Sequence, residues 1–224
     1  MYIKKINMLR YVILLLPVLL FADNKKMHDE DPKNRPHNTL GFGVLGSVYI
    51  NDDQIFIGQT GSTLNNGSVF IYSKSDDGKI NKDQIFPPIV GTVEHDFGFS
   101  ISVDGNSMIV GAPSRAGNGV GRAYIYQRKA SREWVLKKEI VPDSSTWTTD
   151  FGSKVVIEND LILIGDRYAR SEDGMVYALY FNKNLGNWIK INPIWTDQII
   201  SHGLFGHDID IYQNRAIIGS RDGN

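Results

Sequence analysis

Arginines and aromatic residues recur in the polar segments that follow apolar runs of this chain. Binding surfaces are enriched in these two residue types, which mark candidates for non-covalent recognition. The candidates are Arg115, Arg167, Tyr168, Arg170, Arg221, Trp147 and Trp195. We interpret them as a ligand face for a protein or a glycan. The alternative is that they belong to ordinary solvated loops, with the tryptophans packed beneath.

Nucleophilic catalysis has no recognisable motif in the sequence. Serines are plentiful, but no Gly-x-Ser-x-Gly turn is present and no histidine has an acidic partner at a readable spacing. Asp96 and Asp150 each precede a Phe-Gly pair, and we interpret them as turn-capping residues. The sequence therefore predicts a protein that is not an enzyme.

Metal and cofactor sites are not predicted either. Calcium prefers six to eight oxygen ligands, and the hairpin turns of the chain are too short to surround it. These turns are 51–54, 76–78, 104–107, 158–160 and 212–214. His95, His202 and His207 have no third zinc ligand at a suitable spacing. We expect no metal and no cofactor.

A repeat of about 54 residues must position the candidate side chains. Four Phe-Gly pairs are separated by 55, 54 and 54 residues, and four glycines that end apolar runs keep the same step. The pairs begin at Phe42, Phe97, Phe151 and Phe205, and the glycines are Gly58, Gly111, Gly165 and Gly219. Repeats of this length built from short β runs are typical of arrays whose units pack only against their neighbours.

The second repeat shows the content of one unit. Residues 100–103 and 108–110 flank an Asp-Gly turn, which is a strong hairpin signal. Residues 122–126 and 134–140 add two more runs with strand character. Four short strands are the content of one propeller blade. The third repeat has runs in the same places, whereas the first has two extra residues and the fourth ends after two strands.

The second repeat resembles the FG-GAP repeat of integrin-α-like β-propellers. The similar residues are Phe97-Gly98, Gly111-Ala112-Pro113 and Gly121 to Tyr124. The other copies keep Phe-Gly and the strand-ending glycine but replace Ala-Pro. The resemblance implies propeller blades and a role in adhesion or recognition at a surface. Many members of that family bind calcium in the first hairpin of a blade, but the hairpins of this chain are too short for it.

A structural role is expected for the repeat signature itself. We expect each phenylalanine ring to be buried between blades and each neighbouring glycine to permit close backbone packing. The signature residues are Phe97, Gly98, Gly111, Ala112, Pro113, Gly121, Tyr124, Phe151, Gly152, Gly165, Phe205, Gly206 and Gly219.

The fold prediction is an all-β, partial and open β-propeller with about three and a half repeats of four-stranded antiparallel blades. The blades are expected at 41–94, 95–148 and 149–202, with an incomplete one at 203–224. Such an array cannot close a ring and leaves strand edges open. We expect either a longer gene product or completion by further blades or another copy. In a propeller the candidate ligand residues would gather on one face.

The first 40 residues are predicted to form a processing segment followed by a linker. Residues 1–22 have a basic start, eleven apolar residues from Tyr11 and a small residue, Ala22, as in a cleaved secretory signal peptide. That run is short of the roughly 20 residues a membrane span needs. Residues 23–40 are polar and contain two prolines, which predicts a flexible linker.

The amino-acid composition further limits the classes of protein to which the chain can belong. The chain has 24 basic and 25 acidic residues, so the basic footprint of a nucleic-acid binder is absent. It has no cysteine, which in an exported chain of this size favours a bacterial origin. We predict an exported, non-catalytic module for protein or glycan recognition or adhesion, located in the periplasm, at the cell surface or outside the cell. The alternatives are an accessory domain of a larger secreted enzyme and a gene fragment without function.

Overall fold

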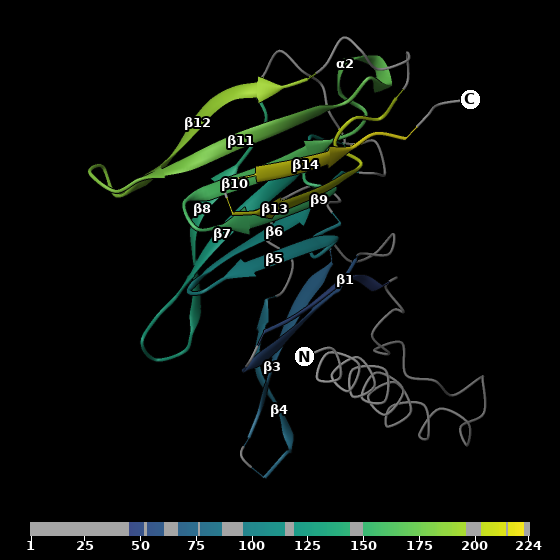
Figure 1. Ribbon diagram of the computed structural model, residues 1–224. Coiled ribbons are helices and arrows are strands. Elements are labelled where there is room, and N and C mark those ends of the chain that lie inside the picture. The colour runs from purple at the N-terminus through teal and green to yellow at the C-terminus, as the bar shows by residue number, and fades with distance from the viewer. Residues whose placement is uncertain are drawn as a thin grey trace, which may run out of the picture. The chain divides into compact units, whose positions relative to one another are not determined.

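The computed structural model describes nine segments of the 224-residue chain (Figure 1). They are 45–51, 53–60, 67–75, 77–86, 96–114, 119–143, 150–195, 203–213 and 215–221, without the side chain of Leu45. The predicted signal peptide and linker lie outside these segments, as do Phe42, His95, Arg115, Trp147 and His202. All described residues belong to a compact unit formed by 41–224.

The first sheet contains four antiparallel strands in chain order. They are β1 (Leu45–Ile50), β2 (Gln54–Gln59), β3 (Ser68–Lys74) and β4 (Ile80–Phe86). Burial alternates along β2 because successive side chains of a strand point to opposite faces. Tyr49, Phe56, Ile71 and Gln84 are cross-strand partners in one row, and this row faces the second sheet.

The second and third sheets repeat this order. The second contains β5 (Ser100–Asp104), β6 (Ser107–Ala112), β7 (Arg122–Arg128) and β8 (Trp134–Ile140). The third contains β9 (Lys154–Glu158), β10 (Leu161–Asp166), β11 (Met175–Asn182) and β12 (Asn187–Ile194), with the short α2 (Ala169–Glu172) between β10 and β11. Both sheets are antiparallel.

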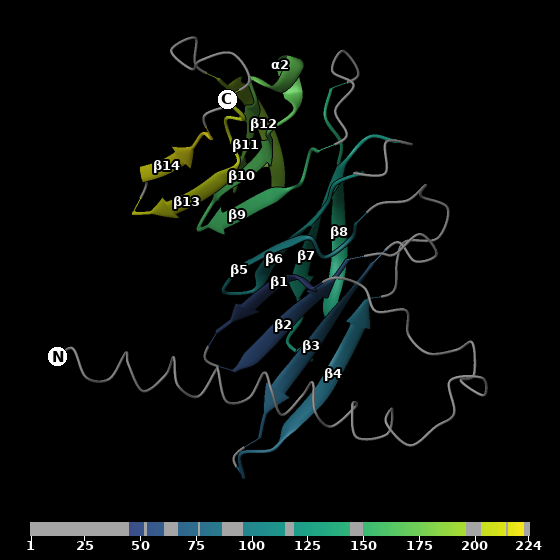
Figure 2. The same cartoon turned by 90° about the vertical axis from the view of Figure 1, so that its right-hand side faces the viewer.

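The fourth sheet has two strands, β13 (Asp208–Tyr212) and β14 (Arg215–Gly219). Figure 2 shows the sheets in succession, and the first strand of each sheet contacts the first strand of the next. The predicted fold is confirmed: the protein is all-β, with blade-like antiparallel sheets in an open array.

Three apolar clusters hold the array together, one between each pair of consecutive sheets. Phe56 and Phe97 belong to the first cluster, Ile109 and Phe151 to the second, and Leu163 and Ile209 to the third. Each inner sheet therefore buries one face against the preceding sheet and the other against the following one, as expected for a repeat array, whereas the first and fourth sheets each bury one face in this way.

Glycines set the distance between consecutive sheets. A Cβ at Gly111 would lie 1.9 Å from the carbonyl oxygen of Gly152, and a Cβ at Gly58 would lie 1.8 Å from that of Gly98. Gly165 meets the oxygen of Gly206 in the same way, at 2.4 Å. The strand-ending glycine of one sheet thus packs on the Phe-Gly glycine of the next, and a side chain at either place would separate the sheets.

Hydrogen bonds join the first strands of neighbouring sheets. The N–H of Ile101 donates to Ser47 Oγ (3.2 Å), and the N–H of Val155 donates to Ser100 Oγ (3.0 Å). Ile157 donates to Ser102 Oγ in the same manner (3.1 Å). These side chains therefore satisfy backbone groups at the open edge of the following sheet.

Candidate ligand-binding surface

Five of the seven predicted ligand residues are described, and they follow the ends of β10, β12 and β14. Arg167 and Tyr168 come directly after β10, Arg170 lies in α2, Trp195 follows β12 and Arg221 comes two residues after β14. Figure 1 shows α2 beyond the end of the third sheet, near the C-terminal end of β14. We call the exposed residues Tyr168, Arg170, Trp195 and Arg221 the α2 face.

Arg170 and Trp195 form a stacked pair. The guanidinium carbon of Arg170 lies 5.1 Å from the centroid of the Trp195 ring, which is the distance of a cation–π contact. Arg170 is exposed and Trp195 is 46% exposed. The pair therefore presents a flat aromatic surface beside a fixed positive charge.

Arg167 has a different environment from the rest of the predicted set. Its Nε lies 2.7 Å from Oδ2 of Asp150, and its side chain is only 17% exposed. Asp150 is fully buried, and the Arg167 guanidinium lies 5.1 Å from the ring centroid of Tyr168. Arg167 thus supports the Tyr168 ring from inside the protein, while Tyr168 itself remains exposed.

The repeat explains why Arg221 differs from Arg167. Position 167 of the third repeat corresponds to 221 of the fourth, but Leu204 stands where the third repeat has Asp150. Arg221 is exposed, and its backbone N–H donates to the carbonyl oxygen of Gly203 (2.7 Å). The fourth repeat therefore directs to the surface a guanidinium that the third repeat pairs internally.

The α2 turn has an unusual backbone. Arg170, Ser171 and Glu172 have φ values of 55°, 60° and 74°, although none is glycine. A left-handed conformation costs such residues about 1–2 kcal/mol each. The turn is held from the fourth repeat, because Leu204 donates to the Glu172 carbonyl (3.0 Å) and Phe205 to that of Asp173 (2.9 Å). The three left-handed positions are not glycine, but Gly174, which also has a positive φ (87°), ends the turn.

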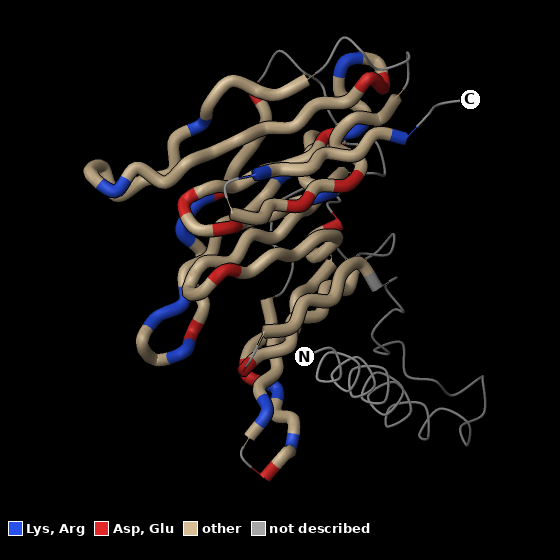
Figure 3. The backbone as a smooth tube through the Cα atoms, viewed as in Figure 1, with Lys and Arg blue, Asp and Glu red and all other residues tan. Residues whose placement is uncertain are grey.

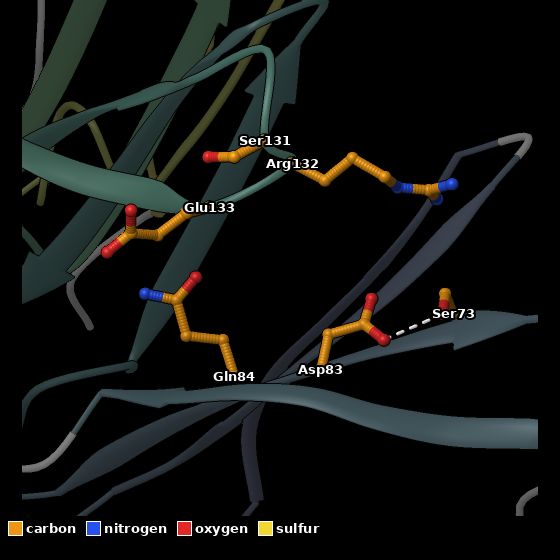
Figure 4. A pocket seen from close by; sticks show the side chains of 6 residues that line it. All are labelled: Ser73, Asp83, Gln84, Ser131, Arg132 and Glu133. Atoms are coloured by element: carbon orange, nitrogen blue, oxygen red, sulfur yellow. Dashed lines mark hydrogen bonds between the residues drawn. The ribbon is translucent and has the colours of Figure 1, made fainter.

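A hollow lies between the first two sheets (Figure 4). Its volume is about 510 Å³, and its lining residues are Ser73, Asp83, Gln84, Ser131, Arg132 and Glu133. It opens between β4 and the turn that joins β7 to β8, where Lys, Arg and Glu residues gather (Figure 3). The sequence reasoning did not single out this hollow.

Two polar residues of this hollow, Gln84 and Asp83, make hydrogen bonds between and within the sheets. Gln84 donates to the carbonyl oxygen of Trp134 (2.9 Å) and accepts from its N–H (3.0 Å). Asp83 accepts from Ser73 Oγ (2.7 Å) and from Gln54 Nε2 (3.2 Å). Ser131 lies in the same turn as Glu133, but no histidine lines the hollow. The Gln84 bonds therefore join the two sheets, whereas the Asp83 bonds connect side chains of the first sheet.

The acidic hairpin turns also contact neighbouring elements. Asn51 Oδ1 accepts from the backbone N–H groups of Asp53 (3.2 Å) and Gln54 (2.7 Å), which is the geometry of an Asx turn. Asp53 Oδ2 pairs with Arg128 (2.8 Å) and Arg132 (3.0 Å) of the second sheet. Among the described residues, no three His, Asp or Glu side chains form a group able to hold a metal.

Comparison with known proteins agrees with this geometry. A family model for the FG-GAP repeat matches residues 90–126, which include β5, β6 and most of β7. This segment is similar to an FG-GAP repeat. No curated protein matches the chain. Across the described segments, helices that are long and apolar enough to traverse a bilayer are absent. The FG-GAP match and the blade-like sheets support a propeller-like module of the recognition or adhesion kind.

Proposed function

We propose that the protein is an exported, non-catalytic module that recognises a protein or a glycan through the α2 face. The observation that carries this proposal is the Arg170–Trp195 pair, which remains exposed although it combines a large ring with a fixed guanidinium. Arginine and tryptophan are the residues most enriched among the side chains that dominate binding energy.

The α2 turn favours binding because it is already ordered. Side chains that must be immobilised on binding each cost about 0.5–1.5 kcal/mol. Arg170 is stacked on Trp195, and the Glu172 carbonyl beside it is bonded to the fourth repeat. Strained backbone of this kind clusters at ligand sites, where surrounding contacts maintain it. The exposure of Trp195 also argues against the alternative in which the tryptophan only packs beneath a loop.

Export and the absence of catalysis are part of the same proposal. Export is supported by the basic and apolar pattern of residues 1–22, which is typical of a secretory leader. A non-catalytic role is supported by the α2 face itself, because its side chains are arginines and aromatic residues without a nucleophile. Secretion to the periplasm or the cell surface would place this face where surface ligands occur.

Binding by alanine variants of the α2 face tests the proposal. The wild type is screened on arrays of defined glycans and of immobilised cell-surface proteins, and Arg170→Ala and Trp195→Ala are then compared on each hit. We expect each change to weaken binding by roughly 30-fold, the size of a typical hot-spot loss of about 2 kcal/mol.

Lys183→Ala is the matched control, because Lys183 is exposed in the turn between β11 and β12. It should bind like the wild type. Equal binding by Lys183→Ala and Trp195→Ala would exclude the α2 face as the ligand site.

A further inference from the structure

One position of the repeat is buried in three sheets and exposed in the fourth. Two residues before the strand-ending glycine, Phe56, Ile109 and Leu163 are each at most 2% exposed, whereas Ile217 is 72% exposed. The first three side chains each pack against the following sheet. Ile217 therefore belongs to a sheet face that in the earlier repeats is always covered. We call this face of β13 and β14 the trailing face.

In the first sheet, two residues are exposed at positions that are buried in the other three sheets. Val48 and Ile50 of β1 are 43% and 42% exposed. Their counterparts in the other sheets are at most 7% exposed, because those residues pack against the preceding sheet. They are Ile101 and Val103 of β5, Val155 and Ile157 of β9, and Ile209 and Ile211 of β13. We call the β1–β4 face that contains Val48 and Ile50 the leading face.

The leading face has one apolar row that crosses the whole sheet, and Lys82 Nζ lies 5.3 Å from the ring centroid of one of its residues, Phe70. Val48 is opposite Ile57, Ile57 is opposite Phe70, and Phe70 is opposite Ile85, so the four side chains lie in one row on one face. All four are at least partly exposed. A soluble protein seldom leaves such a continuous apolar row uncovered.

The trailing face has a glycine, Gly219, at the position where the other three sheets make their close contact. At Gly58, Gly111 and Gly165, an added Cβ would collide with the backbone of the following repeat at 1.8–2.4 Å. At Gly219 the nearest atoms are those of Asp208 in the same sheet, at 3.6–3.9 Å. The fourth sheet therefore ends in the glycine that a close neighbour requires, with open space where that neighbour would lie.

Polar acceptors on the first strand occur in the first two sheets, are replaced by Lys154 and Val156 in the third, and return in the fourth. Ser47, Ser100 and Ser102 each accept a backbone N–H of the next first strand. The corresponding residues of β13 are the exposed carboxylates Asp208 and Asp210. Carboxylates accept backbone N–H groups more strongly than hydroxyls do. The trailing face thus combines an exposed apolar residue with exposed carboxylates, of which Asp208 is paired with Lys154 of the third sheet (2.7 Å).

We propose that the trailing face of one copy of this protein packs on the leading face of a second copy, head to tail. This contact continues the interface that already joins consecutive sheets three times within the chain. Every copy carries one trailing and one leading face, so the two faces are present in equal number. Contacts between unlike faces are heterologous and lead to rings or open chains rather than to twofold dimers.

The test is the mass in solution of the full chain and of face variants. Sedimentation of the wild type from about 1 to about 100 μM, the range of weak protein contacts, should show masses above the 25.2 kDa of one chain. Ile217→Asp on the trailing face and Ile50→Asp on the leading face should each be monomeric. Leu185→Asp is the control, because Leu185 is 68% exposed in the β11–β12 turn, and it should assemble like the wild type.

Mixing the two monomeric variants decides between head-to-tail and like-with-like contacts. Ile50→Asp keeps an intact trailing face and Ile217→Asp an intact leading face, so their mixture should form one heterodimer and nothing larger. Circular dichroism verifies that each variant is folded, and if Ile217→Asp is not, Gly219→Val blocks the same face. A monomeric wild type, or a mixture that remains monomeric, would overturn the proposal.

Discussion

Trp134 illustrates how a single side chain can join two sheets. Its Nε1 donates to Gln54 Oε1 at 3.1 Å in a buried bond, and its ring packs edge-on against Phe56 with centroids 5.7 Å apart. Gln84 binds the backbone of the same residue through two hydrogen bonds. Tryptophan fits this position because it combines a large apolar body with one donor that reaches a buried acceptor.

Trp134→Phe should therefore lower the free energy of unfolding. The change keeps most of the apolar volume but leaves the buried Gln54 oxygen without its donor, which costs about 1–3 kcal/mol. Urea unfolding measures the free energy. Trp195→Phe provides the control, because Trp195 is exposed and should lose less than about 0.5 kcal/mol. Equal losses for the two variants would show that the Gln54 bond does not stabilise the fold.

The tyrosines of the second sheet predict sensitivity to alkaline pH. Burial, together with the nearby Glu139 carboxylate, raises the pKa of Tyr124 to about 12 against the opposing effect of Arg122. Burial also raises the pKa of Tyr126. In the unfolded chain the tyrosine side chains ionise near pH 10. The free energy of unfolding that the neutral, buried phenols contribute below pH 10 is therefore lost as the pH rises towards 12.

The melting temperature should accordingly fall between pH 10 and pH 12, as measured by circular dichroism. The double variant Tyr124→Phe with Tyr126→Phe should show a smaller fall, because it has no buried phenol to ionise in this cluster. Tyr180→Phe, at an exposed site of β11, should behave like the wild type. Identical pH profiles for all three proteins would contradict the assignment.

At the scale of elements, most strands could be predicted because the alternation and turn signals are strong in the second and third repeats. The predicted run 134–140 coincides with β8, and 100–103 differs from β5 by one residue. Residues 122–126 continue to Arg128 because Gln127 and Arg128 pair with β8 across the ladder. Polar side chains can extend a strand when a partner strand is present, and the register with that partner is not visible in local sequence.

The candidate site was only partly predictable. The loop positions of Arg170 and Trp195 follow from the repeat, but their contact depends on the α2 turn, whose left-handed residues 170–172 are not glycines. The ion pair of Asp150 with Arg167 joins residues on either side of β9 and β10. From the sequence we interpreted Asp150 as a turn-capping residue. The ion pair could not be predicted, because the distance between Asp150 and Arg167 depends on the folded sheet.

Close contact between sheets gives a prediction at two equivalent glycines. In Gly111→Ala the new Cβ would overlap the Gly152 carbonyl, so the second and third sheets must move apart. We expect a loss of about 3 kcal/mol or more, at the upper end of single substitutions. Gly219→Ala is the matched change, because its Cβ would meet only atoms of its own sheet at ordinary contact distances.

Thermal or urea unfolding of the two variants measures the difference. Gly219→Ala should unfold within about 0.5 kcal/mol of the wild type at low protein concentration. Similar destabilisation by both changes would mean that glycine matters at these positions for backbone freedom rather than for contact between sheets.

At the scale of the whole molecule, stability depends on neighbours. The three apolar clusters each join two consecutive sheets, so an inner sheet is supported on both faces and an end sheet on one. The fourth sheet is also the smallest, with two strands and an exposed Ile217. Local opening should therefore be easiest there, because few buried contacts must be broken.

Native-state hydrogen exchange can resolve this gradient strand by strand. In dilute protein, amides of β13 and β14 should exchange faster than those of β6, β7, β10 and β11, which lie inside sheets covered on both faces. Raising the concentration should slow exchange in β14 and β1 together if the trailing and leading faces meet, and should leave β6 and β7 unchanged. Protection of β13 and β14 equal to that of β10 and β11 in dilute protein would contradict this gradient. Stability would then be shared across the whole array rather than built from contacts between neighbouring sheets.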